Sequence, residues 1–340
     1  MFSTGTYLDD RTLSGTVTIA ETGKSDSTLI AMLYQDGDDS AVVKKRPRYI
    51  ARLDGKGHFT FRSLPSGTFY LYAVKDDGGT RRYTDPSQLF AFAGKPINLS
   101  ANNEPVSLYA YVEKPDEPKR GSSGTAPATA SKEKKSEDKR LRYQTNLESG
   151  QQDILDTLRI QFASPLRTFD SSKLQFTDEK FQRLGNYTIV PDSLNQKFTF
   201  LYKWKPGTAY NLIFPKDLAE DSAGRKLIKI DTIDFKTKKE EDYGILRLRF
   251  PALDLSQHPV MLLVQGDKVV FTYTFTSKEY YTKLFQPGEY DLRILYDENG
   301  NGRWDPGQFF GKHKQPEKVR PIEEKIKVKS NWENDKTIAL

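Results

Sequence analysis

Residues 286–310 read QPGEYDLRILYDENGNGRWDPGQFF, and residues 65–90 read PSGTFYLYAVKDDGGTRRYTDPSQLF. With one inserted residue, the alignment pairs Gly67 with Gly288, Asp76 with Asp297, Asp85 with Asp305, and Phe90 with Phe310. Each stretch has a run of aromatic and aliphatic residues between glycine-containing turns, which is typical of a β-strand followed by a loop. The repeat predicts that both ends of the chain use the same β module.

The residues around both stretches continue this pattern. Short runs rich in Val, Ile, Thr, Tyr and Phe are separated by turn clusters such as DGDDS and DGKG. Before the first stretch these runs cover residues 13–20, 28–35, 48–54 and 58–64. Short strands at this spacing indicate an antiparallel sandwich, which we expect to occupy residues 1–113.

A change of composition follows this first unit. Residues 114–140, KPDEPKRGSSGTAPATASKEKKSEDKR, contain no aromatic residue and are rich in Pro, Ser, Ala, Lys and Glu. Such a segment cannot bury enough apolar surface to offset the entropy lost on ordering. We interpret it as a flexible, disordered linker. Beyond it, strand-like runs resume, and we expect two further sandwiches at 141–238 and 239–340. The predicted fold class is all-β, as tandem sandwiches.

Composition excludes several classes of function. The net charge of +6 comes from 52 basic and 46 acidic residues that are intermixed along the chain, unlike the clustered basic stripe of a nucleic-acid-binding protein. The absence of cysteine excludes disulfides and thiolate chemistry. No segment approaches the roughly 18 consecutive apolar residues of a membrane-spanning helix, and the first residues lack the pattern of a signal peptide.

The loop after residue 296 has the spacing DxNxNGxxD of a calcium-binding loop. Such loops place oxygen ligands at alternate positions and a glycine at position 6, and here Gly302 takes that position. The predicted ligands are Asp297, Asn299, Asn301, Arg303 through its carbonyl, and Asp305. With few charged ligands, calcium would bind weakly, with a Kd of roughly 10⁻⁴ to 10⁻³ M.

A structural alternative for this loop stays open. Gln308 stands where a calcium loop has its bidentate glutamate. The Asn-Gly steps can instead serve a hairpin, with Asp305 capping backbone amides and Trp304 packing on the sheet. The counterpart loop in the first unit carries Gly78 and Thr80 in place of the two asparagines, so the module tolerates their loss.

Motifs of catalysis are missing from the sequence. There is no G-x-S-x-G elbow and no H-E-x-x-H helix motif. The three histidines are far apart. We therefore predict that the chain is not an enzyme. The aromatic-rich residues 271–285, FTYTFTSKEYYTKLF, could offer a sugar-stacking face, although alternating Tyr and Phe more often form a core.

Three stretches carry a resemblance to a known family: residues 2–17, residues 44–76 and residues 290–310. They resemble the Ig-like domain-containing lipoproteins of Bacteroidota. The resemblance implies a transthyretin-like, carboxypeptidase-regulatory-type sandwich first, a bacterial Ig-like domain second, and a relative of the first module third. It also implies an upstream Ig-like domain, and because residues 1–5 precede the first sandwich as residues 233–238 (IDFKTK) precede the third, we expect them to be the last strand of that domain.

The resemblance sets the functional expectations. It implies an extracytoplasmic protein held at the outer membrane, on its periplasmic face or at the cell surface, by an N-terminal lipid anchor that lies outside this sequence. We expect a non-enzymatic scaffolding or interaction subunit whose partners are outer-membrane or cell-surface proteins. The alternative is a glycan-binding surface module that serves polysaccharide uptake.

Overall fold

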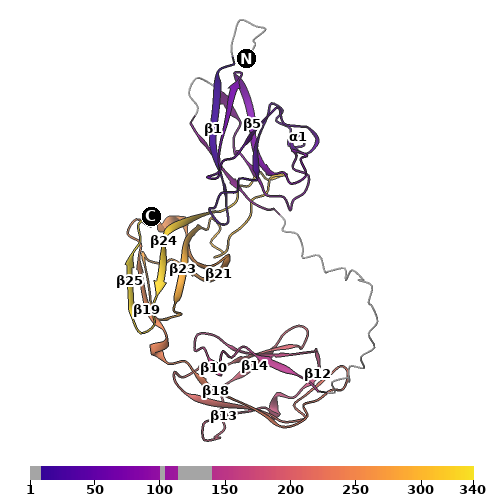
Figure 1. The fold of residues 1–340 in the computed structure, drawn as a ribbon, viewed down its shortest axis with the longest axis vertical. Helices are drawn as coiled ribbons and strands as arrows, with labels where there is room; N and C mark the ends of the chain where they lie inside the picture. Colours follow the sequence, from indigo (N-terminus) through magenta and orange to yellow (C-terminus); the bar gives the residue numbers. More distant parts are fainter. Residues whose placement is uncertain (1–8, 100–103, 114–139) are drawn as a thin grey trace.

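The computed structural model describes residues 9–99, 104–113 and 140–340 and is almost entirely β-sheet (Figure 1). Its strands form three groups, which we call the first, second and third sandwich in chain order. The expected linker, except for Arg140, and the expected strand at residues 1–5 lie outside the described residues. No helix in the described part of the chain is long and apolar enough to cross a membrane.

The first sandwich has two sheets with strand orders β4-β1-β8 and β3-β2-β5-β6, and β7 also pairs with β5. In the smaller sheet, β1 runs antiparallel to β4 and parallel to β8. A short helix lies between β2 and β3. The elements are β1 (Arg11–Ile19), β2 (Leu29–Tyr34), α1 (Ala41–Lys44), β3 (Tyr49–Arg52), β4 (His58–Leu64), β5 (Gly67–Lys75), β6 (Phe90–Phe92), β7 (Ile97–Leu99) and β8 (Val106–Ala110).

The third sandwich has the same topology as the first. Its sheets have the orders β22-β19-β25 and β21-β20-β23-β24, and β19 is again antiparallel to one neighbour and parallel to the other. The elements are β19 (Gly244–Arg249), η3 (Leu255–Gln257), β20 (Pro259–Gln265), β21 (Lys268–Thr274), β22 (Glu279–Phe285), β23 (Gly288–Tyr296), β24 (Lys318–Val328) and β25 (Glu333–Thr337). The repeat seen in the sequence therefore corresponds to β5 and β23 together with the loops that follow them.

Both repeat strands begin at a glycine that needs its conformational freedom. Gly67 has φ of 143° and Gly288 has φ of 158°. A Cβ at Gly288 would also lie 2.9 Å from the side-chain nitrogen of Gln265. The paired glycines of the two repeats thus mark one backbone geometry that residues with a side chain rarely adopt.

The second sandwich packs the sheet β10-β18-β16-β13 against the sheet β14-β15-β11-β9, and a small β12-β17 pair lies beside them. Its core is rich in aromatic residues, including Phe162, Phe176, Phe200 and Trp204. The elements are β9 (Tyr143–Thr145), β10 (Gln151–Gln152), β11 (Leu158–Phe162), β12 (Leu166–Phe169), η1 (Ser171–Lys173), β13 (Gln175–Asp178), β14 (Thr188–Pro191), β15 (Lys197–Leu201), β16 (Ala209–Phe214), β17 (Ala219–Asp221), β18 (Asp231–Thr237) and η2 (Glu240–Asp242).

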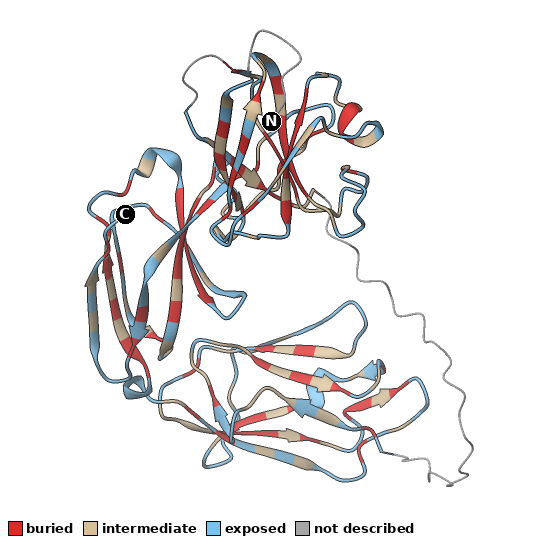
Figure 2. Cartoon of the chain, turned by 45° about the horizontal axis from the view of Figure 1, so that its top comes forward, coloured by how far each residue is buried: buried red, intermediate tan, exposed pale blue. Residues whose placement is uncertain are grey.

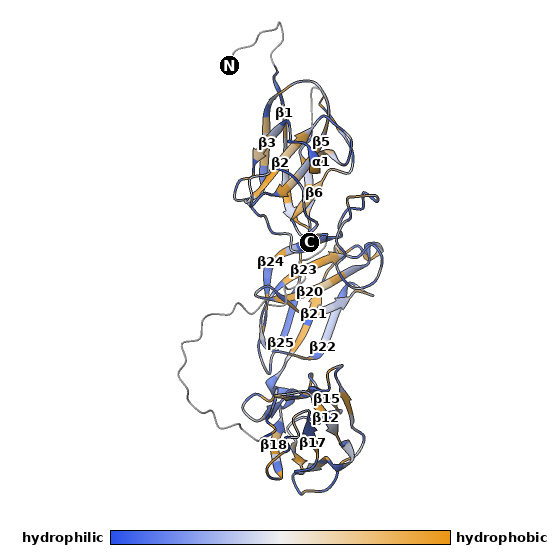
Figure 3. Ribbon diagram, turned by 90° about the vertical axis from the view of Figure 1, so that its right-hand side faces the viewer, coloured by the Kyte–Doolittle hydropathy of each residue, from blue (hydrophilic) through white to orange (hydrophobic). Residues whose placement is uncertain are grey.

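Burial patterns explain why the sequence forms these strands. Strand β1 alternates between buried and partly exposed side chains, as expected where one face meets a core. In contrast, five of the six residues of β2 and the first six of β20 are buried, because the larger sheet of each repeat module is covered on both faces (Figure 2). In Figure 3 the hydrophobic strand β20 contrasts with the hydrophilic edge strands β24 and β25.

The order of the sandwiches in space differs from their order in the chain. Figures 1 and 3 show the third sandwich between the first and the second. The third sandwich therefore makes two interfaces, one with the first sandwich and one with the second. Both interfaces involve loops that the repeat singled out.

Candidate functional site

The predicted calcium loop follows β23 and leads to β24, so it covers residues 297–317. At its start, Asp297 is fully buried. Its carboxylate accepts hydrogen bonds from the backbone amides of Gly300 at 2.7 Å and Gly302 at 2.6 Å. Both glycines have positive φ, 73° and 75°. The loop is therefore wound around the Asp297 carboxylate, whereas the structural alternative gave the amide-capping role to Asp305.

The other predicted ligands lie in the same turn. The side-chain amides of Asn299 and Asn301 both donate to Asp305 Oδ2, the latter at 2.9 Å. The backbone amide of Arg303 donates to Asn301 Oδ1 at 2.7 Å. The structure thus brings Asn299, Asn301 and Asp305 together, while Asp297 is bonded to the backbone of the turn.

Glu317 is a member of this loop that the sequence analysis missed. It is buried, with 1% of its surface exposed, and its two carboxylate oxygens accept the backbone amides of Glu298 at 3.0 Å and Asp305 at 2.9 Å. Burial, together with the neighbouring charges of Asp297 and Asp305, raises the pKa of the Glu317 carboxyl. It lies far beyond position 12 of a calcium loop, so the motif could not indicate it.

The donor set fits calcium in its chemistry, because it consists of carboxylate and amide oxygens. Gln308, at the position of the missing glutamate, pairs its backbone with that of Lys314. Among the described residues, no three acidic or histidine side chains converge on one point as a metal centre. Calcium would need the amides of Asn299 and Asn301 to turn their oxygens toward Asp305. Calcium at this loop stays a prediction.

The second half of the loop reaches into the first sandwich. Phe309 is buried, with 1% of its surface exposed, in an aromatic cluster on the outer face of the sheet formed by β2, β5 and β6. Its ring centroid lies 5.1 Å from that of Phe92, 5.3 Å from Phe90 and 5.6 Å from Tyr72. A residue of the third sandwich therefore completes a core of the first. The two adjacent phenylalanines in a Gly- and Pro-rich loop were the only sequence signal of this contact.

Close backbone approach accompanies this insertion. A Cβ at Gly307 would lie 2.7 Å from the ring of Tyr111. The aligned residue of the first module is Ser87, so the side chain is missing where the loop passes against the neighbour. Gly307 thus permits the loop to lie flat on Tyr111.

Polar contacts surround the inserted phenylalanine. His313 Nε2 lies 2.7 Å from Asp39 Oδ2, and the Gln315 side chain donates to the Phe92 carbonyl at 3.1 Å. The backbone amide of Val319 donates to the carbonyl of Ala20 at 2.9 Å. The interface between the first and third sandwiches thus has an apolar centre and a polar rim.

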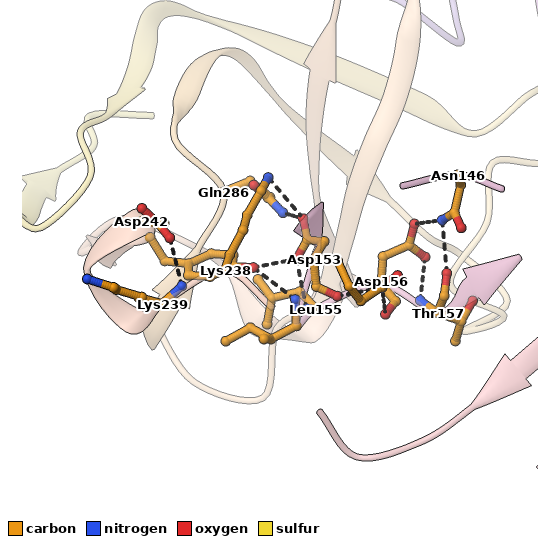
Figure 4. Close-up of polar contacts among 12 residues, drawn as sticks. Asn146, Asp153, Leu155, Asp156, Thr157, Lys238, Lys239, Asp242 and Gln286 are labelled. Carbon is orange, nitrogen blue, oxygen red and sulfur yellow. Dashed lines mark hydrogen bonds and ion pairs between the residues drawn. The ribbon is translucent and has the colours of Figure 1, made fainter. Parts of the chain in front are cut away.

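The interface between the second and third sandwiches centres on Asp153 (Figure 4). The Tyr243 hydroxyl donates to Asp153 Oδ1 at 2.7 Å, and the Gln286 side chain donates to the other carboxylate oxygen. The same Tyr243 hydroxyl accepts the amide of Ile154 at 2.9 Å. Burial and the Asp153 hydrogen bond raise the pKa of Tyr243.

Comparisons with known proteins do not give a family for this chain. No protein-family model matches the chain. The search of curated proteins found no match. Among solved structures, α2-macroglobulin from Escherichia coli (domains MG0-NIE-MG1) matches with TM-score 0.26 and 12% identity over 54% of this chain and 72% of that one.

Two further solved structures match over 97% of this chain. BcpA, the major pilin subunit of Bacillus cereus, has TM-score 0.21 and 10% identity over 97% of its own length. The Bacillus anthracis TIE protein has TM-score 0.24 and 11% identity over 50% of its length. At these TM-scores none of the three indicates what this chain does, and the all-β fold rests on its own strands.

Proposed function

We propose that this chain is a non-enzymatic scaffolding subunit of the bacterial cell envelope, a Bacteroidota-type lipoprotein that binds other outer-membrane proteins. The observation that carries the proposal is Phe309 of the third sandwich buried in the aromatic cluster of the first. Together with the Asp153 interface, it fixes three sandwiches in one elongated arrangement. A fixed spacing between surfaces is what a scaffold needs.

The two interfaces differ from the contacts of loosely strung domains. Domain contacts within a chain are by default polar and mobile. Here the first interface contains a fully desolvated aromatic ring, and the second contains hydrogen bonds to a largely buried carboxylate. Both types of contact depend on distance and angle, so they fix the relative position and orientation of the sandwiches.

Affinity capture tests the proposal. The chain would be tagged and used to capture proteins from detergent-solubilised outer membranes of its source. We expect one membrane protein to be recovered in a stoichiometric amount. Phe309→Ala should reduce that recovery, because it removes the fixed spacing of the first and third sandwiches, whereas Phe181→Ala on an exposed turn of the second sandwich should leave it unchanged.

Two results would contradict the scaffold. Recovery of no stoichiometric partner at any detergent strength is one. Equal recovery by the Phe309→Ala protein, after its sandwiches are shown to have separated, is the other. The alternative, a glycan-binding surface module, involves different residues of the third sandwich.

A further inference from the structure

A cavity of about 570 Å³ lies at one end of the outer face of the sheet β22-β19-β25. This volume is within the range of small-molecule sites. The cavity is lined by side chains of the third sandwich and by the turn η2 that joins it to the second. Tyr243, whose hydroxyl contacts Asp153 at the second interface, also lines this cavity, whereas within the described part of the chain Trp332 takes part in neither interface.

The most unusual side chain at the cavity is Trp332. Its exposed fraction is 65%, the largest of the exposed apolar side chains in the described residues. The other two tryptophans of the chain are buried or half-buried: Trp204 is 8% exposed, and Trp304 packs against the apolar cluster beside β23. An indole left in water at the rim of a hollow offers a flat apolar surface with one hydrogen-bond donor.

The turn that carries Trp332 is held firmly. Its carbonyl accepts hydrogen bonds from the amide of Ile245 and from the Asn334 side chain, both at 3.0 Å. The preceding residue, Asn331, has a left-handed φ of 52° and donates its amide to the carbonyl of Tyr243 at 2.8 Å. Because this backbone is already ordered, little further conformational entropy is lost when a ligand binds to the indole.

Charged groups of both signs line the same cavity as the indole. Lys239 pairs with Glu241 at 2.8 Å. Glu240, Lys283 and Glu333 also line the cavity, and they form no ion pair within the part of the chain that the structure describes. Carboxylates can only accept hydrogen bonds here, and ammonium groups can only donate them. A ligand that satisfies all of these groups must donate and accept at neighbouring points.

We propose that this cavity binds a pyranose ring of a neutral polysaccharide. The hydroxyls of a pyranose both donate and accept, and its apolar C–H face can lie on the indole of Trp332. A protein anchor is disfavoured by the same surroundings, because hot-spot tryptophans are enclosed by groups that exclude water, and here charged side chains line the cavity beside Trp332. The site goes beyond the scaffolding proposal, and among the described residues Tyr243 is the one cavity-lining residue that also belongs to the Asp153 interface.

The test uses the full chain and a panel of soluble neutral polysaccharides: a β-glucan, an α-mannan, a galactan and a xylan. Acrylamide quenching of tryptophan fluorescence reports mainly Trp332, because the other two tryptophans are shielded. We expect at least one polysaccharide to protect the indole from acrylamide. Trp332→Ala should weaken binding of that polysaccharide in affinity electrophoresis at least about tenfold, as loss of an aromatic contact implies.

Matched variants separate the site from general effects. Glu333→Gln keeps the shape of the cavity and removes one charged acceptor, so it should weaken binding several-fold. Phe181→Ala removes an aromatic ring that is 64% exposed on the second sandwich, and Phe309→Ala acts at the distant interface. Both should bind polysaccharide as the unaltered chain does.

Three outcomes would overturn the proposal: no polysaccharide protects the indole, binding survives Trp332→Ala, or Trp332→Ala abolishes capture of a membrane protein instead. Melting temperatures of Trp332→Ala and the unaltered chain should agree, since the side chain is exposed. If the two melting temperatures differ, the binding of Glu333→Gln and the acrylamide quenching of the unaltered chain test the proposal in place of Trp332→Ala. Failure of the membrane-protein capture would leave this site untouched, so the two proposals can fail separately.

Discussion

Replacing Phe309 by alanine should separate the first and third sandwiches without unfolding either. The ring is 1% exposed and packs on three aromatic rings of the first sandwich. Truncating a buried phenylalanine costs about 3–5 kcal/mol. Because Phe309 belongs to a loop and not to the core of its own sandwich, the substitution should reduce the free energy of docking of the two sandwiches and not the free energy of unfolding of the third.

The magnitude decides the expected outcome. Each 1.4 kcal/mol changes an equilibrium about tenfold, so the docked state should lose between roughly a hundredfold and a few thousandfold in population ratio. The exposed His313–Asp39 pair contributes about 0–1 kcal/mol, and the hydrogen bonds of Gln315 with Phe92 and of Val319 with Ala20 contribute about 0.5–1.5 kcal/mol each. They cannot replace the buried ring.

Distance measurement between spin labels tests this prediction. The chain has no cysteine, so Lys56→Cys in the first sandwich and Thr276→Cys in the third can be labelled selectively. The unaltered interface should give one narrow distance distribution, and Phe309→Ala should give a broad one. Gly307→Val, which places a side chain against Tyr111, should have a similar effect. A narrow, unshifted distribution for Phe309→Ala would refute the reasoning.

Three further predictions concern the loop and the second interface. Calcium should bind the unaltered chain and Asp76→Ala, the counterpart control, with a Kd of roughly 10⁻⁴ to 10⁻³ M, and calorimetry should show no binding to Asp297→Ala; absence of calcium-dependent heat in the unaltered chain would exclude the site. Because the folded pKa of Glu317 is raised, the contribution of this group to stability is fully present below its unfolded pKa and is lost as pH rises above the ordinary value of 4.5 and through the folded pKa. In the presence of a chelator, the difference in melting temperature between the unaltered chain and Glu317→Gln should change over that pH range. A pH-independent difference would contradict this prediction. Tyr243→Phe removes one hydrogen-bond donor from the Asp153 carboxylate, which costs about 1–3 kcal/mol. The contact between the second and third sandwiches should then weaken, and small-angle scattering should show a broader range of shapes. An unchanged scattering profile would count against this interface.

Strand existence could be predicted from the sequence because each strand carries its own pattern. The alternation in β1 and the continuous apolar runs of β2 and β20 are local, and side-chain burial follows from them. The three-residue strands β6 and β7 lack enough residues to show a period. They were missed because pairing with β5 holds them in place, and not their own composition.

The candidate site was predicted only in its local half. Asp297, Asn299 and Asn301 lie within a few residues of one another, so a spacing motif can indicate them. The contact of Phe309 with Phe92 joins residues more than two hundred positions apart, and no period in the sequence encodes it. Glu317 was missed for a related reason, since it lies at the far end of the loop, directly before β24.

One exchange between the two repeat modules explains why only the third reaches out to a neighbour. In the first module, the amide of Asp85 donates to the side-chain oxygen of Gln88 at 3.0 Å, so the turn closes on itself. In the third module, the aligned amide of Asp305 donates to the Glu317 carboxylate.

That exchange has two consequences. The residues between Asp305 and Glu317, Phe309 among them, no longer close the turn and can extend to the first sandwich. The amide acceptor is also replaced by a buried carboxyl group whose pKa is raised, so its negative charge, when ionised, is disfavoured at the base of the docking loop. A cation or a proton that neutralises this charge would stabilise the base of the loop, and the loop carries Phe309. Docking of the two sandwiches should therefore strengthen with added calcium at neutral pH, and the same label distances can measure it.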